Sequence, residues 1–570
     1  MEKVKEFLKL SSQCERESGH EISSAKAAIF NRKAAEEYYV QVRGHFNSSH
    51  VKELTPYYKR VLELAEQGNA EKQHEAGECY FYGTVVPLDY AKAAEWYQKA
   101  ANQHFANAQT NLGYCYEFGK GVPQDHVKAA EWYQKAADQG NACAQTNLGC
   151  CYRDGIGVLQ DYVKAVEWYQ KSADQGYANG QTSLGWCYEC GKGVLQDYAK
   201  AVELYQKAAD QGNACAQTNL GYCYECGTGV PKDYAKAVEW YQKAAYQGYA
   251  RAQYNLGDCY FYGRGVPQDY TKAVELFQKS ADQNYAKAQT DLGYCYEYGK
   301  GISQDYTKAV ELYQKAADQG NACGQTNIGL CYEFGTGVSK DYAKAVEWYQ
   351  KAASQDYARA QTNLGYCYEC GKGVPKDYAK AAEWYQKAAS QDYARAQTHL
   401  GYFYFHGKGV PQDYAKSVEL YQKAVSQGDA WAQNNLGWCY ECGKGVPKDY
   451  AKAAEWYQKA ANQGNAYAMT NLGSCYYYGK GVPQDYTKAV ELYRKAVDQN
   501  DARGQYYLGL CYENGKGVFK DHVKAFELYQ KAAEQGNKDA QKKLGNCYEK
   551  GIGVRRDLNK ASEWYKKASE

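Results

Sequence analysis

Paired cysteines are the residues of this sequence best suited to chemistry. Four segments read Cys-Tyr-Glu-Cys, namely Cys187/Cys190, Cys223/Cys226, Cys367/Cys370 and Cys439/Cys442. Cysteine thiolates at this spacing bind zinc, and two pairs brought together would supply four ligands. However, the first cysteine of each pair occupies a position that is also cysteine in segments without a second one. We therefore expect no bound metal and no cofactor, and a thiol-rich zinc-binding or redox protein is the alternative.

The candidates for catalysis are weaker. Histidines such as His104, His126, His399 and His406 are scattered, and no Gly-rich phosphate loop lies between a strand and a helix. We expect no enzyme and no catalytic residues. A Ser-His-Asp or Cys-His arrangement is defined by geometry, so the sequence leaves that possibility open.

The elements that position these residues repeat strictly. A glycine recurs every 36 residues without insertion or deletion, at Gly77, Gly113, Gly149, Gly185, Gly221, Gly257, Gly293, Gly329, Gly365, Gly401, Gly437, Gly473, Gly509 and Gly545. A fixed period of this length is typical of units that bury their apolar faces by stacking on their neighbours. The sequence therefore predicts an array whose function resides in a surface.

One copy shows the predicted unit. Residues 106–118 have the period of an amphipathic helix whose buried stripe is centred on Leu112. Gly113 borders the stripe, where the absence of a side chain would let a second helix approach. Gly119 is expected to end the helix in the left-handed conformation, and Asp125 to cap a second helix over 125–139. That helix would bury Tyr133 among alanines.

The charge balance and the apolar content of the chain limit the kinds of partner that we expect. The 570 residues include 68 Lys and Arg against 66 Asp and Glu, a formal net charge of +2. This balance does not favour nucleic acid as a partner. The N-terminus lacks the apolar core of a secretory signal, and no stretch is apolar enough for membrane insertion.

The positions of the cysteines indicate the cellular compartment of the protein. Thirteen of the 22 cysteines share one repeat position, from Cys79 to Cys547, with Phe403 as the exception. Neighbouring copies would lie about 8 to 10 Å apart, beyond the roughly 7 Å limit for a disulfide. We expect buried thiols in a reducing compartment, and hence a cytoplasmic protein.

The repeated pattern A-x-A-Q-x-N-L-G-x-C-Y-x-x-G-x-G-V, followed by D-x-x-K-A-x-E-W-Y-x-K-A-A, resembles the Sel1-like repeat. The resemblance implies an all-α fold, an αα-hairpin solenoid with a right-handed superhelix of about fourteen units, related to tetratricopeptide repeats. The expected organisation is an N-terminal helical segment without repeats (1–52), a partial repeat helix (53–69) and fourteen repeats (70–570).

The resemblance also implies a function. Members of this family are mostly adaptors and scaffolds, so we expect a non-catalytic protein that binds other proteins. A cysteine-rich branch has been assigned β-lactam binding or hydrolysis, and its repeats carry a disulfide between the two helices. Here Lys135-Ala136-Ala137 has no cysteine at the end of the second helix, which disfavours that alternative.

Variation between copies points to a binding surface. The sites of Asn107, Tyr114 and Phe118 vary most, and they lie far from the core direction of the first helix. Exposed aromatic residues mixed with arginine are typical of protein-binding hot spots. The alternative is that these aromatics pack sideways between adjacent first helices. The predicted partner-binding groove comprises Tyr114, Trp186, Tyr222, Arg251, Tyr294, Arg359, Tyr366, Arg395, Tyr402, Trp431 and Trp438.

Overall fold

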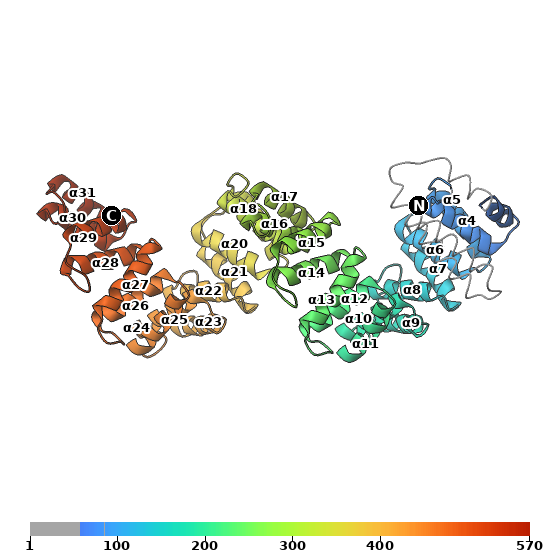
Figure 1. Ribbon diagram of the computed structural model, residues 1–570, viewed down its shortest axis with the longest axis horizontal. Helices are drawn as coiled ribbons and strands as arrows, with labels where there is room; N and C mark the ends of the chain where they lie inside the picture. The colour runs from blue at the N-terminus through green and yellow to red at the C-terminus, as the bar shows by residue number, and fades with distance from the viewer. Residues whose placement is uncertain (1–57, 85, 570) are drawn as a thin grey trace. The chain divides into compact units, whose positions relative to one another are not determined.

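The computed structural model describes residues 58–84 and 86–569. Over these ranges the chain forms helices joined by short turns, without a strand. The chain divides into two compact units, the first ending at Ser280 and the second beginning at Ala281. Within each unit the helices follow one another in pairs (Figure 1). The predicted segment 1–52 lies outside the described residues, whereas residues 58–66 of the predicted partial repeat form a helix.

In the first unit each repeat contributes a first and a second helix. The first helices are α4 (Ala70–Tyr82), α6 (Ala106–Phe118), α8 (Ala142–Asp154), α10 (Ala178–Cys190), α12 (Ala214–Cys226) and α14 (Ala250–Tyr262). The second helices are α5 (Tyr90–Asn102), α7 (His126–Asp138), α9 (Tyr162–Asp174), α11 (Tyr198–Asp210), α13 (Tyr234–Tyr246) and α15 (Tyr270–Asp282), which crosses the boundary between the units.

The second unit continues the pattern. Its first helices are α16 (Ala286–Tyr298), α18 (Ala322–Phe334), α20 (Ala358–Cys370), α22 (Ala394–His406), α24 (Ala430–Cys442), α26 (Ala466–Tyr478), α28 (Ala502–Asn514) and α30 (Lys538–Lys550). Its second helices are α17 (Tyr306–Asp318), α19 (Tyr342–Ala353), α21 (Tyr378–Ser390), α23 (Tyr414–Ser426), α25 (Tyr450–Asn462), α27 (Tyr486–Asp498), α29 (His522–Glu534) and α31 (Leu558–Ser569).

The helix ends follow from their capping residues. Gly119 adopts φ 63° after α6, and its N–H donates to the carbonyl of Cys115, as expected for a left-handed C-cap. Before α7 the Asp125 carboxylate accepts a hydrogen bond from the Lys128 N–H at 3.0 Å. The predicted first helix matches α6, and the predicted second helix matches α7 with Asp125 and Gln139 as its caps.

The core of each hairpin is an aromatic ring packed on a glycine, and the ring belongs to a tyrosine in every repeat except that of Phe277. Tyr133 of α7 is fully buried, and its ring lies where a Cβ on Gly113 would come within 2.7 Å of it. Ala108, Leu112 and Cys115 complete the buried side of α6. The expected close approach at Gly113 is therefore confirmed, because any side chain there would displace the ring.

Consecutive repeats are joined at their loops by a second glycine. Gly121 has φ +75°, and a Cβ on this residue would overlap the carbonyl group of Tyr90 at the start of the preceding second helix. Gly119 and Gly121 thus have different roles: the first ends the helix, and the second lets the loop lie on the backbone of the previous repeat.

At the opposite end of the hairpin a pair of glutamines links its two helices, and one of the two also bonds to the preceding repeat. The Gln139 amide donates to Oε1 of Gln109 at 2.7 Å, and the Gln109 amide donates to the carbonyl of Ala101 at 3.1 Å. The same glutamine pair occurs at Gln103/Gln73, Gln175/Gln145, Gln211/Gln181, Gln247/Gln217, Gln319/Gln289, Gln355/Gln325, Gln391/Gln361, Gln427/Gln397, Gln463/Gln433 and Gln535/Gln505.

First helices also approach the first helices of neighbouring repeats. Contacts of this kind join α8 with α10 and α12 with α14 in the first unit, and α20 with α22 and α26 with α28 in the second. Within each unit, each hairpin otherwise packs on the next one in sequence. This arrangement is the αα-hairpin solenoid that the sequence predicts, with first helices of neighbouring repeats side by side within each unit.

Candidate functional site

The varying positions of the first helix lie on its exposed side. In α6, Asn107, Tyr114 and Phe118 are all exposed, while the residues between them are buried or half-buried. Positions 107, 114 and 118 are separated by seven and four residues, so they lie along one stripe of the helix. We call the equivalent positions of all repeats the first-helix stripe.

The structure divides the predicted groove residues into two groups. The side chains exposed on the first-helix stripe are Tyr114, Tyr222, Tyr294, Arg395, Trp431 and Trp438. The half-buried ones are Trp186, Arg251, Arg359, Tyr366 and Tyr402. The stripe therefore combines exposed aromatic rings and Arg395 with half-buried residues.

Three of the half-buried members contact neighbouring first helices. Arg251 donates to Oδ1 of Asn219 at 3.1 Å, and Arg359 donates to Oδ1 of Asn327 at 3.2 Å. The ring of Trp186 lies 5.6 Å from the guanidinium carbon of Arg153. Sideways packing between first helices, which the sequence left as the alternative, thus accounts for part of the stripe.

The most accessible aromatic cluster lies on α24 and α26. Trp431 and Trp438 are 52% and 44% exposed, and Tyr467 of the following repeat is 44% exposed. The rings of Trp431 and Tyr467 have centroids 5.1 Å apart. Apolar rings that remain this exposed contribute little to folding, so they are available to a partner.

The Phe118 site is one of the three varying positions of the first helix, but the predicted groove contains no residue from this site. The structure shows large exposed aromatic side chains there: Tyr82, Phe118, Tyr262, Tyr298, Phe334 and Tyr478. In the sequence, each of these side chains could have been recognised as an aromatic residue directly before the glycine that ends the first helix. Tyr114 and Phe118 contact each other, with centroids 4.5 Å apart, so the two sites form one aromatic surface.

The Cys-Tyr-Glu-Cys pairs have one buried and one exposed member. Cys187 is buried and Cys190 exposed, and the other three pairs follow the same pattern. Burial raises the pKa of the Cys187 thiol to about 12, so it stays protonated at neutral pH. Between residues 58 and 569, Val85 apart, no three His, Cys, Asp or Glu side chains are grouped so that they could hold a metal ion.

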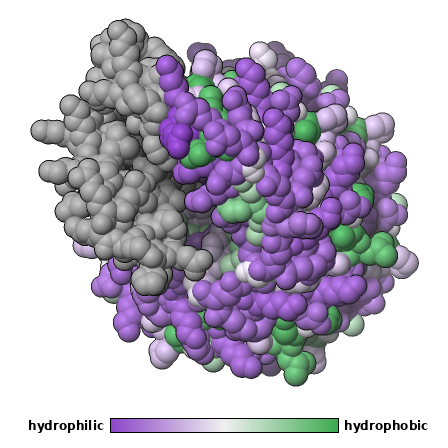
Figure 2. Space-filling model, turned by 90° about the vertical axis from the view of Figure 1, so that its right-hand side faces the viewer, coloured by the Kyte–Doolittle hydropathy of each residue, from purple (hydrophilic) through white to green (hydrophobic). Residues whose placement is uncertain are grey.

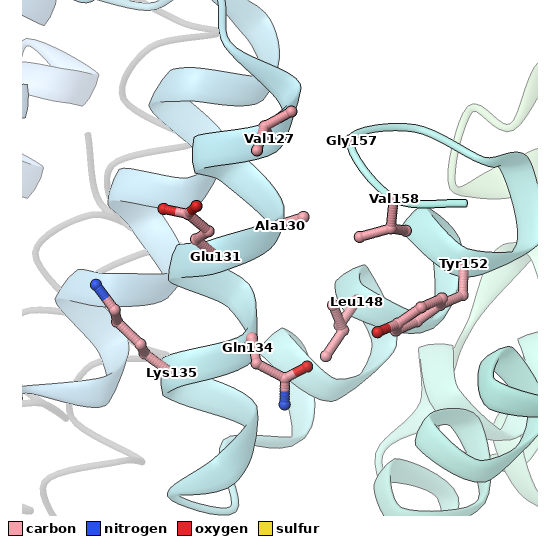
Figure 3. A pocket seen from close by; sticks show the side chains of 9 residues that line it. All are labelled: Val127, Ala130, Glu131, Gln134, Lys135, Leu148, Tyr152, Gly157 and Val158. Atoms are coloured by element: carbon pink, nitrogen blue, oxygen red, sulfur yellow. The ribbon is translucent and has the colours of Figure 1, made fainter. Parts of the chain in front are cut away.

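A shallow cavity of about 450 Å³ lies between α7 and the following repeat (Figure 3). Val127, Ala130 and Gln134 line it from α7, and Leu148 and Val158 face them from the next repeat. A cavity of about 430 Å³ occupies the equivalent place one repeat earlier, beside Ala94. Repeats three to eight have valine at the site of Ala94 and Ala130, from Val166 to Val346. The two cavities therefore lie in repeats in which this site holds the smaller side chain of alanine.

On the face drawn in Figure 2, hydrophobic residues form separate small groups within a mostly hydrophilic surface. Among the described helices, none combines the length and the apolar character needed to span a bilayer.

The stacked helical hairpins and their exposed stripe define the chain as an αα-hairpin repeat protein. The Sel1 repeat model matches it fourteen times, at residues 73–105, 106–141, 144–177, 178–213, 216–249, 250–285, 286–321, 324–357, 358–393, 394–429, 432–465, 466–501, 502–537 and 538–570. The chain therefore belongs to the Sel1 repeat family.

Solved structures include similar proteins. A protective antigen of uropathogenic Escherichia coli strains, which displays an SLR fold, is 35% identical, with a TM-score of 0.53 over 85% of this chain and 97% of its own. A Sel1 repeat protein from Oxalobacter formigenes is also 35% identical and aligns over 54% of this chain and 89% of its own, with a TM-score of 0.39. None of the curated proteins compared with the sequence matches it.

Proposed function

We propose that this protein is a non-catalytic scaffold that binds segments of partner proteins along the first-helix stripe. The observation that carries the proposal is the exposed aromatic cluster of Trp431, Trp438 and Tyr467 on α24 and α26. Tryptophan and tyrosine are enriched among the residues that dominate the energy of protein interfaces. A repeat array supports such binding because its stripe continues from one hairpin to the next.

Site-specific photo-crosslinking tests this function in cells that express the chain. A photoreactive phenylalanine analogue replaces Trp438 on the stripe or, as a matched control, Tyr246 at the end of second helix α13, where the side chain is 95% exposed. We expect discrete adducts with particular proteins from position 438 and none of these from position 246. The same adducts from both positions would contradict the proposal.

Alanine substitution provides the second arm of the test. Trp431→Ala with Trp438→Ala should abolish the adducts formed from position 467, because the exposed rings no longer supply the contact. Both side chains are about half-exposed, so the helical content measured by circular dichroism should not change. Adducts that persist in the double variant would show that the cluster does not hold the partner.

The thiols support a cytoplasmic location for this scaffold. The cysteines from Cys79 to Cys547 are free thiols in the described residues. Free thiols are typical of a reducing compartment. Thiol titration of the protein taken directly from its own cells should recover them, and recovery of far fewer would place it in an oxidising compartment.

A further inference from the structure

The first-helix stripe changes its charge between the two units. In the first unit its charged sites are Glu71, Glu78, Asp154 and Asp258, with Arg251 as the one cation among them. In the second unit, helices α20 and α22 have Arg359 and Arg395 at the Asn107 site. The loops that follow α20, α22 and α24 add Lys372, Lys408 and Lys444. A chain with a formal net charge of only +2 therefore collects cations on one part of one face.

Most of these cations lack a carboxylate partner. Within the described ranges, Arg359, Arg395, Lys408 and Lys444 form no ion pair, whereas Lys372 is paired with Glu333 at 3.2 Å. Lys408 donates to the Tyr402 hydroxyl at 3.3 Å, a neutral partner. Unpaired cations beside one another repel, and a negatively charged partner would relieve that repulsion.

The carboxylates on the same helices point into the hairpins. Glu369 accepts a hydrogen bond from the hydroxyl group of Tyr385 at 2.7 Å, and Glu441 accepts one from the hydroxyl group of Tyr457 at 2.8 Å. Asp429 accepts a hydrogen bond from the Ala432 N–H and so caps α24. These carboxylates keep their negative charge, but each is engaged by a partner within the fold and none is paired with Arg359, Arg395, Lys408 or Lys444.

Aromatic residues alternate with the cations along this part of the stripe. Tyr366 and Tyr402 lie beside Lys372 and Lys408, with each ammonium nitrogen between 4.7 and 4.8 Å from the ring centroid. On α24 the Asn107 site is Trp431 and the Tyr114 site is Trp438. The surface therefore offers both charge and apolar area within a few repeats.

We infer that the stripe of α20, α22, α24 and α26 binds an extended acidic segment of a partner protein. Its carboxylates would pair with Arg359, Arg395, Lys408 and Lys444, and its apolar side chains would lie on Trp431 and Trp438. Four first helices spaced about 8 to 10 Å apart span roughly 30 Å, which about ten extended residues cover. This inference rests on the proposed function and assigns the chemical class of its partner.

Selection from a library of random dodecapeptides displayed on phage tests the inference with the full chain. We expect the enriched peptides to be rich in Asp and Glu with interspersed aromatic or aliphatic residues. A fluorescent copy of an enriched peptide should lose affinity as salt is raised, because its ion pairs are exposed. Enrichment of basic or uncharged peptides would overturn the inference.

Charge-reversal variants in the second and the first unit test where the enriched peptide binds. Arg359→Glu with Arg395→Glu should weaken binding of the enriched peptide about tenfold, measured by fluorescence anisotropy. Arg251→Glu is the control, because Arg251 occupies the same repeat position and makes the same asparagine bond in the first unit. Equal effects of both changes would contradict a site on α20 and α22.

Two further outcomes distinguish a failure of this inference from a failure of the proposed function. If Trp431→Ala and Trp438→Ala abolish peptide binding but the arginine reversals do not, the acidic partner is wrong and the proposed function stands. If neither set of changes affects binding, the stripe is not the binding site and both proposals fail. A single-stranded oligonucleotide that binds more tightly than every selected peptide would identify nucleic acid as the partner and overturn the inference.

Discussion

The hydroxyl group of Tyr133 donates a hydrogen bond to Oε2 of Glu117 at 2.6 Å. This bond joins the second helix of a hairpin to the end of its first helix, directly beside the tyrosine ring that fills the space over Gly113. The same bond occurs at Tyr205/Glu189, Tyr241/Glu225, Tyr313/Glu297, Tyr349/Glu333, Tyr385/Glu369, Tyr457/Glu441, Tyr529/Glu513 and Tyr565/Glu549. Where the tyrosine site is Phe277, the glutamate site is Phe261, so both members of that pair are apolar.

Tyr133→Phe should destabilise its hairpin by about 1 to 2 kcal/mol, because the carboxylate of Glu117 loses a donor. The double variant Tyr133→Phe with Glu117→Phe should recover part of the loss, since it copies the Phe277/Phe261 pair. Amide hydrogen exchange of α6 and α7 is the measurement, because it reports on this hairpin separately from the rest of the array. Unchanged exchange in the single variant would show that the bond contributes nothing.

Gly113→Ala should destabilise the array even though alanine favours helices by about 1 kcal/mol. The new Cβ would lie 2.7 Å from the Tyr133 ring, and such overpacking costs about 1 to 3 kcal/mol. Gly324→Ala is the comparison within a first helix, and it should cost less: its Cβ would lie 2.8 Å from that of Ala316, but other repeats accommodate two alanines at these sites, as Ala108 and Ala100 show. Thermal unfolding should separate the two variants, and an equal shift would argue against the steric account.

Ala130→Val should stabilise the junction between α7 and the next repeat by about 1 kcal/mol, because the added methyl groups enter the apolar cavity beside Leu148. Valine occupies the same site in a buried position at Val238 and Val346. Ala136→Val, at a fully buried alanine, should instead destabilise the hairpin. Urea unfolding followed through circular dichroism compares them. A loss of stability in Ala130→Val would show that the cavity cannot accept a larger side chain.

Alkaline pH should destabilise the fold. Burial raises the pKa of the Cys115, Cys187 and Cys259 thiols to about 12, whereas a thiol in an unfolded chain titrates at about 8.5. The folded state therefore retains protons that the unfolded state loses, and stability present below pH of about 8.5 declines as pH rises toward 12. The melting temperature at pH 7 and at about pH 10 provides the measurement.

Cysteine variants test the cause of this pH dependence. Changing Cys115, Cys187 and Cys259 to alanine should make the decline shallower, whereas changing the exposed Cys226 and Cys370 should not. Buried tyrosines with raised pKa values, such as Tyr133, contribute in the same direction and leave a residual slope. An unaltered slope in the first set would assign the effect to the tyrosines alone.

The sequence predicted the elements because each depends on residues close together in the chain. The 36-residue period, the apolar stripe around Leu112 and the caps at Gly119 and Asp125 give the bounds of α6 and α7 directly. The need for a glycine at position 113 was also predictable, since a glycine in the middle of a helix is unfavourable unless packing requires it.

Contacts between distant residues were not predictable in the same way. The Tyr133 to Glu117 bond and the contact of Gly121 with Tyr90 depend on how the helices and repeats are stacked. For the same reason, the sequence predicted that the stripe forms one face of the first helix, but it did not predict which residues of the stripe would be half-buried. Trp186 is partly covered because Arg153 of the preceding repeat lies over it, and no periodic pattern encodes that neighbour.

The glutamine bond at each junction, such as that from the Gln109 amide to the Ala101 carbonyl of the preceding repeat, also bears on how such a chain changes over generations. Every junction that has this bond uses the same donor site and the same acceptor site, and these sites recur every 36 residues. An in-frame loss or duplication of one unit in the gene would therefore bring together two surfaces that already fit. The length of the array can change by recombination without any new junction, and the length of its binding face changes with it.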